Sequence, residues 1–129
     1  IGTWWMMGST DRAFAALIRD MSERGLLDET LVCFVTEFGR TPKLNKSQGR
    51  DHWTGAYSIA MAGAGVPGGQ VIGASDRDGG YVTDSPYTPD DYAATIYHKL
   101  GLDFGEPLST LDNRPIPLAA HGKPIPELL

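Results

Sequence analysis

The sequence has little of three features that would narrow its function at once: cysteine, basic charge and long apolar runs. Its 129 residues include one cysteine, Cys33, so no disulfide can form within the chain, and the thiol is expected to be a buried structural residue. Lys and Arg number 11 against 16 Asp and Glu, and the cations are scattered. This balance argues against nucleic acid and against an anionic membrane as partners, because both need a basic face. No stretch is long and apolar enough to span a bilayer.

The start of the chain, IGTWWMMGST, also lacks a basic residue and an initiating Met, so no signal peptide is recognised there. Because the chain begins among apolar and aromatic residues, we expect it to be a fragment or a processed piece of a longer protein. Its length suits one domain rather than two. The predicted organisation is therefore one domain over residues 1–129.

Two helices are predicted from apolar residues that recur at helical spacing. The first is predicted to begin at Ser9 or Thr10 and to end before Gly25, a residue type that favours the position after a helix. The second has Thr88 as its expected N-cap, followed by Pro and two acids, and is predicted to end at Gly101.

Two apolar runs, LVCFV (31–35) and AYSIAMAGAGV (56–66), predict strands. LVCFV has no polar alternation, which is typical of a parallel strand covered on both faces. Gly-Gly pairs at 68–69 and 79–80 indicate turns, and the Pro-rich end could hold one hairpin near 113–116 or 121–124. The order of these elements predicts an α/β fold, a sheet with helices on its faces.

The polar segment TEFGRTPKLNKSQGRDHW, residues 36–53, lies between the two strands and is predicted to be a loop. It leaves the carboxyl end of LVCFV, where open α/β sheets usually bind ligands. Glu37 and His52 are candidate ligands for Zn²⁺, Mn²⁺ or Fe, and Asp51 could ligate or orient the imidazole. Arg40 and Arg50 are candidate contacts for a phosphate or sulfate group, because guanidinium groups match those oxygens.

Structural roles for the same residues stay open. Glu37 could pair with Arg40 or Arg50 on the surface, Asp51 and His52 could form a hydrogen-bonded pair that fixes the loop, and Arg40 could only cap carbonyl groups. Adjacent side chains diverge in a regular strand, so Asp51 and His52 could share an ion only from a loop.

Five blocks of the sequence resemble a known family in the right order: RGLLDETLVCFVTEFGRTPKLN, GRDHW, AGAGVPGGQVIGASD, TPDDYAATIYHKLGLD and NRPIPLAAHGKPIPELL. Together they resemble the carboxyl-terminal part of the bacterial DUF1501 family, whose members are sulfatase-like proteins of the alkaline phosphatase superfamily. The resemblance implies part of an α/β/α sandwich with a mostly parallel sheet and flanking helices. It also implies a hydrolase-type protein acting on a phosphate or sulfate ester, with a divalent metal such as Zn, Mn or Ca, and export to the periplasm.

The resemblance implies a metal ligand pair at the end of the strand, where members of the superfamily have Asp followed by His. Here Glu37 replaces the Asp, and Phe38 stands in place of the His and cannot ligate. His52 could restore an imidazole from the following loop. The nucleophile and first metal ligands of the superfamily come from an amino-terminal part, so this chain alone is expected to be inactive. A non-catalytic module that binds a sulfated glycan or a protein partner is the alternative.

Overall fold

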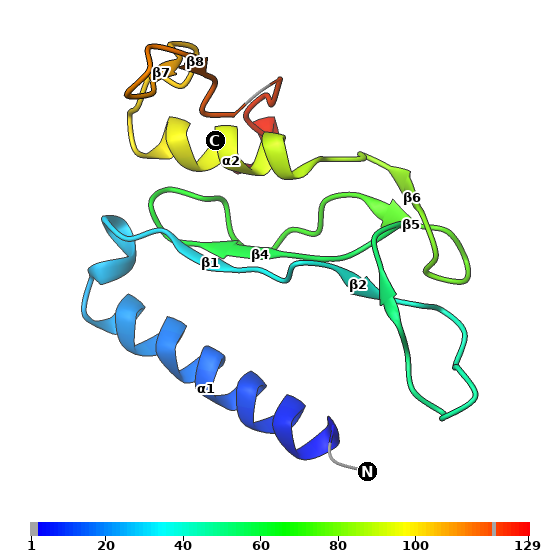
Figure 1. Cartoon of the computed structure of the whole chain (residues 1–129). Coiled ribbons are helices and arrows are strands. Elements are labelled where there is room, and N and C mark those ends of the chain that lie inside the picture. Colours follow the sequence, from blue (N-terminus) through cyan, green and yellow to red (C-terminus); the bar gives the residue numbers. More distant parts are fainter. Residues whose placement is uncertain (1–2, 120) are drawn as a thin grey trace. The chain divides into compact units, whose positions relative to one another are not determined.

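The computed structural model describes residues 3–119 and 121–129, and side chains from residue 6 onward. The chain divides into two compact units, which are described here one at a time (Figure 1). Unit 1 is Ile1–Phe34 with Ala60–Val66, and unit 2 is Val35–Ile59 with Pro67–Leu129. That the whole chain forms one domain stays a prediction.

Unit 1 begins with the helix α1, Thr3–Glu23, which starts earlier than the sequence indicated. The predicted start at Ser9 or Thr10 is wrong, because the helix runs through Gly8 and the hydroxyl of Thr10 donates to the carbonyl of Met6 within it instead of capping its start. The half-buried residues of the described helix lie at helical spacing: Phe14, Ile18 and Met21. As predicted, the helix ends before Gly25, whose φ of 70° places it in the left-handed region. The short 3-10 helix η1, Leu26–Asp28, follows.

The strands of unit 1 pair in the direction opposite to the prediction. β1 (Val32–Phe34) and β4 (Ala60–Ala62) are antiparallel, with Cys33 opposite Met61. The ring of Phe34 lies 5.1 Å from that of Phe14, so α1 covers one face of this ribbon. No described residue of unit 1 is buried, and the expected burial of Cys33 is only partial.

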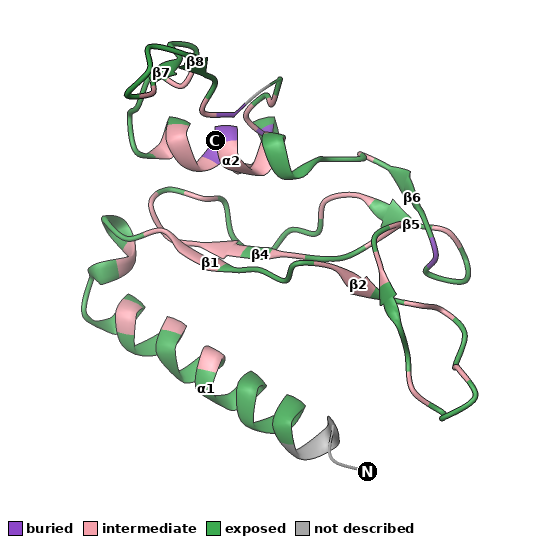
Figure 2. Cartoon of the chain, in the orientation of Figure 1, coloured by how far each residue is buried: buried purple, intermediate pink, exposed green. Residues whose placement is uncertain are grey.

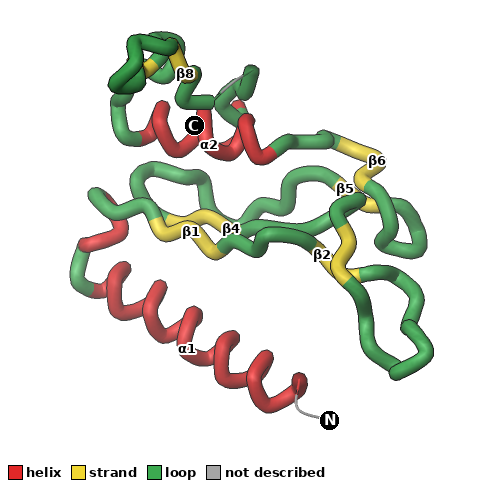
Figure 3. The backbone as a smooth tube through the Cα atoms, in the orientation of Figure 1, coloured by secondary structure: helices red, strands yellow, loops and turns green. Residues whose placement is uncertain are grey.

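The mostly parallel α/β/α sandwich predicted for the chain is therefore wrong for the described residues. They form four sheets, each of two antiparallel strands. Figure 3 shows that the strands are short and joined by long loops. Parallel neighbours need a long crossover connection, usually helical, whereas residues 35–59 between β1 and β4 contain no helix. The other ribbons are in unit 2: β2 (Gly39–Arg40) with β3 (His52–Trp53), β5 (Ala74–Ser75) with β6 (Val82–Asp84), and β7 (Leu108–Ser109) with β8 (Pro115–Ile116).

The second helix, α2 (Pro89–Lys99), confirms its predicted boundaries. Thr88 and Asp91 form a capping box, in which the Thr88 hydroxyl accepts from the Asp91 amide and the Asp91 carboxylate accepts from the Thr88 amide. At the other end, Gly101 has a φ of 69°, and the amide of Leu102 donates to the carbonyl of Tyr97.

The carboxyl-terminal segment, residues 121–129, packs along α2, where most of the buried residues of unit 2 gather (Figure 2). Ala94 and Thr95 belong to the helix, and Ile125 belongs to the segment. Thr95 is fully buried; its hydroxyl accepts from the Ile125 amide at 2.9 Å and donates to the Asp91 carbonyl at 2.7 Å. The Lys123 amide donates to the Asp91 carboxylate at 2.8 Å. A side chain at Gly122 would meet the backbone of Asp90. The segment ends in the 3-10 helix η2, Pro126–Leu128.

Two ionisable groups report on this packing. Hydrogen bonds from the Lys123 amide and from Thr88 hold the pKa of the Asp91 carboxyl below its ordinary value. The hydroxyl of Tyr87 donates to the Glu127 carboxylate at 2.7 Å, and this bond raises the pKa of Tyr87. Among the described residues, no helix combines the length and the apolar content needed to cross a membrane.

Candidate functional hairpin

The segment predicted as a loop is a β-hairpin, and its pairing decides which side chains share a face. In the β2–β3 register, Arg40 is opposite His52 and Gly39 is opposite Trp53. The amide of Thr41 donates to the carbonyl of Asp51 at 3.0 Å and continues the ladder. Side chains of paired residues lie on the same face of a ribbon. The hairpin therefore places Arg40 and His52 on one face.

The tip of the hairpin is closed by a single side chain, Asn45. The side-chain Oδ1 of Asn45 accepts from the backbone amides of Ser47 and Gly49, and the backbone amide of Asn45 donates to the Gly49 carbonyl at 2.8 Å. Gln48 takes a φ of 57° within this turn. Asn is well suited to this role because its short side chain can replace a backbone partner in a turn.

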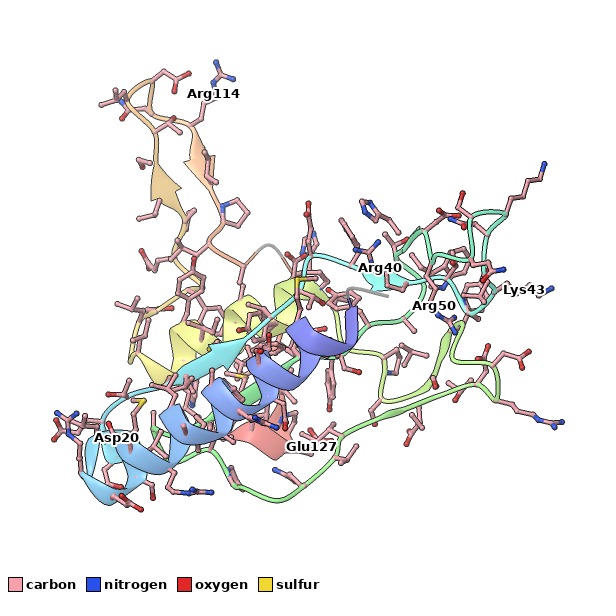
Figure 4. All side chains as sticks on the ribbon, turned by 90° about the horizontal axis from the view of Figure 1, so that it is seen from below. Asp20, Arg40, Lys43, Arg50, Arg114 and Glu127 are labelled. Carbon is pink, nitrogen blue, oxygen red and sulfur yellow. The ribbon has the colours of Figure 1, made fainter. Side chains whose placement is uncertain are left out.

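Both arginines hydrogen-bond the backbone of the opposite arm of the hairpin. Nη1 of Arg50 donates to the carbonyls of Thr41 and Pro42, and Nη1 of Arg40 donates to the carbonyl of Arg50 at 3.3 Å. Figure 4 shows Arg40, Arg50 and Lys43 close together on this hairpin. The alternative in which Arg40 caps a carbonyl group is thus observed, and Arg50 does the same. An arginine has five N–H donors, so one or two such bonds do not exhaust either side chain.

Phe38 completes the face that carries Arg40 and His52. Its ring is stacked on the imidazole of His52 with centroids 3.8 Å apart, and the guanidinium carbon of Arg40 lies 5.7 Å from the Phe38 centroid. A guanidinium group at this distance is attracted by the face of the ring. The ring of Phe38 thus positions two nitrogen-bearing side chains.

The three candidate metal ligands are not gathered at one point. Asp51 precedes the extended residue His52, so the two side chains diverge, and the Asp51 carboxylate accepts from the Asn45 side chain at 2.8 Å. Glu37 is exposed and forms no ion pair with either arginine in the described part of the chain. Across residues 3–119 and 121–129, no three His, Cys, Asp or Glu side chains could together hold a metal. The metal role of Glu37, Asp51 and His52 stays a prediction.

The charge of the hairpin differs in sign from that of the chain. Residues 36–53 carry four cations and two carboxylates, a formal net charge of +2, while the whole chain has −5. The four cations, all exposed, are Arg40, Lys43, Lys46 and Arg50. The cations that are scattered in the sequence thus include one local basic group, which favours an anionic ligand at this hairpin.

The opposite face of the hairpin is fixed to the β5–β6 connection through Trp53. Its indole N–H donates to the carbonyl of Gly80 at 2.6 Å, and its ring packs edge-to-face with that of Tyr81, with the ring centroids 5.4 Å apart. The carboxylate of Asp76 in turn accepts from the amides of Gly80 and Tyr81. Trp53 and Asp76 therefore hold β3 in place.

Sequence reasoning missed Phe38 and Asn45 as organising residues of the site. Phe38 was read only as the loss of a ligand. The spacing Phe-x-Arg in one arm and Arg-x-His in the other is a period-two pattern that could have indicated a ribbon with these four side chains on one face. Asn45 and Gly49 in the middle of the segment could likewise have indicated a turn.

A family model described as "Protein of unknown function (DUF1501)" matches residues 5–129 of the chain. No curated protein and no solved structure matches the chain.

Proposed function

Because the chain belongs to the DUF1501 family of proteins of unknown function, we propose its function from the geometry of the hairpin: residues 36–53 bind the anionic group of a phosphate or sulfate ester. The ligand is an ester such as a sulfated glycan, and Arg40 and Arg50 are its principal contacts. In this proposal the chain is the binding part of a sulfatase-like protein and is not catalytic on its own.

The observation that carries this proposal is the arrangement of Arg40 over Phe38, opposite His52. The ring and the backbone bond restrict the guanidinium group, so less side-chain freedom is lost when an anion binds. Arg50, fixed to two carbonyls of the other arm, adds a second guanidinium group to the same hairpin. Sulfate and phosphate esters present several oxygens, which two such groups can contact together.

The proposal is tested by titrating a sulfated oligosaccharide into the chain and measuring its affinity by calorimetry. Charge-assisted hydrogen bonds contribute about 1.5–3 kcal/mol, so Arg40→Ala should weaken binding about tenfold or more. Arg40→Lys should recover only part of the affinity, because an ammonium group cannot form the bidentate contact. Arg114→Ala is the matched control: it removes an exposed Arg from the β7–β8 hairpin and should change the affinity less than about twofold. Equal losses for Arg40→Ala and Arg114→Ala would contradict a specific site.

Metal-dependent ester hydrolysis is the second candidate function. The Phe38–His52 stack favours it, because it brings the backbone of Glu37 next to an imidazole from the other arm. Glu37 and His52 would be ligands for Zn, Mn or Ca, and Asp51 a further ligand or a partner of the imidazole. A bound metal would polarise an ester oxygen and stabilise developing charge.

Metal content distinguishes the two candidates. Elemental mass spectrometry of the purified chain should find near-stoichiometric metal if Glu37 and His52 are ligands, and Glu37→Gln should abolish it because a neutral amide is a poor ligand. Glu106→Gln, at another exposed glutamate, is the control. Oligosaccharide binding that persists in a chelator and in Glu37→Ala would support the binding function instead.

A further inference from the structure

We propose that Asn45 keeps the anion site of the hairpin open, by holding the carboxylate of Asp51 away from the cations that would bind the ligand. This inference rests on the proposed function, because it concerns how the arginines stay available to an anion from solution. Asn45 is a positioning residue in this proposal, since it acts through Asp51 and does not itself touch the ligand.

Asp51 is a carboxylate that could occupy the site from within the chain. It directly follows Arg50, and both residues contact Thr41 across the hairpin. The Asp51 amide donates to the Thr41 hydroxyl at 3.1 Å, and Nη1 of Arg50 donates to the Thr41 carbonyl at 2.6 Å. An arginine binds a carboxylate with the same donors that bind phosphate or sulfate. A carboxylate tethered beside the guanidinium group would therefore compete with an external anion at a high effective concentration.

These two opposite charges are adjacent in the chain but do not pair. Both side chains belong to exposed residues, and the two ion pairs among the described residues lie outside the hairpin. The Asp51 carboxylate accepts instead from the side-chain amide of Asn45 at 2.8 Å. A neutral amide satisfies a carboxylate oxygen without neutralising a cation. The guanidinium group of Arg50 thus stays free to bind a ligand with its remaining donors.

The turn fixes Asn45 in the position that this task needs. Its side-chain oxygen accepts from the backbone amides of Ser47 and Gly49, which leaves its NH₂ group to donate to Asp51. An aspartate can close a turn in the same way, because it offers the same oxygen acceptor. It would lack the donor and would repel Asp51. The turn alone therefore does not require Asn at residue 45, whereas the contact with Asp51 does.

The test compares the loss caused by Asn45→Ala in two backgrounds, the wild-type chain and Asp51→Asn. Inorganic sulfate is titrated at constant low ionic strength with a chelator present, and amide NMR shifts give the affinity. With Asp51 present, Asn45→Ala frees a carboxylate that can pair with a cation, so the loss should be about two- to fivefold larger than in Asp51→Asn. Any effect of Asn45→Ala on the turn itself is common to both backgrounds and cancels in the comparison.

Glu37→Gln provides a matched control background. Glu37 is the other carboxylate of residues 36–53, and no described hydrogen bond joins it to Asn45. This variant removes one negative charge from the hairpin, as Asp51→Asn does, but it leaves the proposed competitor in place. Asn45→Ala should therefore cause the same loss in Glu37→Gln as in the wild-type chain. A loss that shrinks equally in both backgrounds would reflect net charge alone and would overturn the proposal.

The outcomes separate this inference from the proposed function. An equal loss in the wild-type and Asp51→Asn backgrounds would overturn the inference and leave sulfate binding intact, because Asn45 would then act through the turn alone. A wild-type chain that binds no sulfate at the hairpin would contradict the proposed function. A crystal structure of Asn45→Ala then tests the holding role without a ligand. A carboxylate of Asp51 within about 4 Å of a nitrogen of Arg50 or Lys43 supports that role, and an unpaired Asp51 overturns it.

Discussion

The packing of the carboxyl-terminal segment on α2 should depend strongly on the hydroxyl of Thr95. Replacing Thr95 with Val keeps the volume of the side chain but removes the acceptor of the Ile125 amide. Thr95 is 0% exposed and Ile125 3% exposed, so water cannot replace the lost partner. The Asp91 carbonyl also loses the Thr95 hydroxyl as a donor, but it keeps the backbone N–H that pairs with it within the helix.

The size of the effect follows from the group left unpaired. A buried donor without a partner costs about 1–3 kcal/mol, and we take about 2 kcal/mol for the Ile125 amide. For a chain of this size this corresponds to a fall in Tm of about 8 °C. Urea unfolding followed by circular dichroism measures the change, and hydrogen exchange of the Ile125 amide locates it.

Thr10→Val is the matched control for this prediction. The Thr10 hydroxyl makes the same kind of bond to the carbonyl four residues earlier, but on an exposed helix and with no second partner. Its loss should change the free energy of unfolding by less than about 0.5 kcal/mol. A Thr95→Val effect no larger than that of Thr10→Val, with unchanged exchange at Ile125, would refute the reasoning.

Three further predictions concern other contacts. The pKa of Asp91 is lower in the folded chain than its ordinary value of 3.8. The contribution of this carboxylate to stability is therefore fully present above the unfolded pKa and is lost as pH falls through the folded pKa. Asp91→Asn should remove this acid dependence, which unfolding curves measured from pH 6 to 2 would show. Trp53→Phe leaves the buried Gly80 carbonyl without its indole donor and should cost about 1–3 kcal/mol in urea unfolding. Arg50→Lys keeps the charge but not the fork that reaches two carbonyls, so hydrogen exchange should accelerate in residues 41–51, whereas Arg77→Lys should leave it unchanged.

Local signals made α2 predictable from the sequence, whereas the pairing of strands that are distant in the sequence could not be predicted. Thr88, Pro89 and Asp91 specify the start of the helix through contacts within one turn, so no tertiary information is needed. The apolar run of β1 correctly predicted a strand, but an apolar run does not reveal the direction of its neighbour. That direction depends on the path of residues 35–59, which return as a hairpin rather than through a helix.

The candidate site was located by sequence but its internal organisation was not. Position after an apolar strand was enough to single out residues 36–53. The orientation of Asp51 away from His52 follows from an extended backbone at β3, which the prediction of a loop left open. The contacts of Arg40 and Arg50 with carbonyls across the hairpin likewise depend on the turn built around Asn45.

The most direct test of the central claim is a residue-resolved titration of the isotope-labelled chain with inorganic sulfate, followed by amide NMR shifts in the presence of a chelator. The account predicts saturable shifts concentrated at Phe38, Arg40, Arg50 and His52, which disappear in Arg40→Ala and persist in Arg114→Ala. Shifts spread evenly over exposed Lys and Arg residues, or none at the hairpin, would contradict an anion site at residues 36–53.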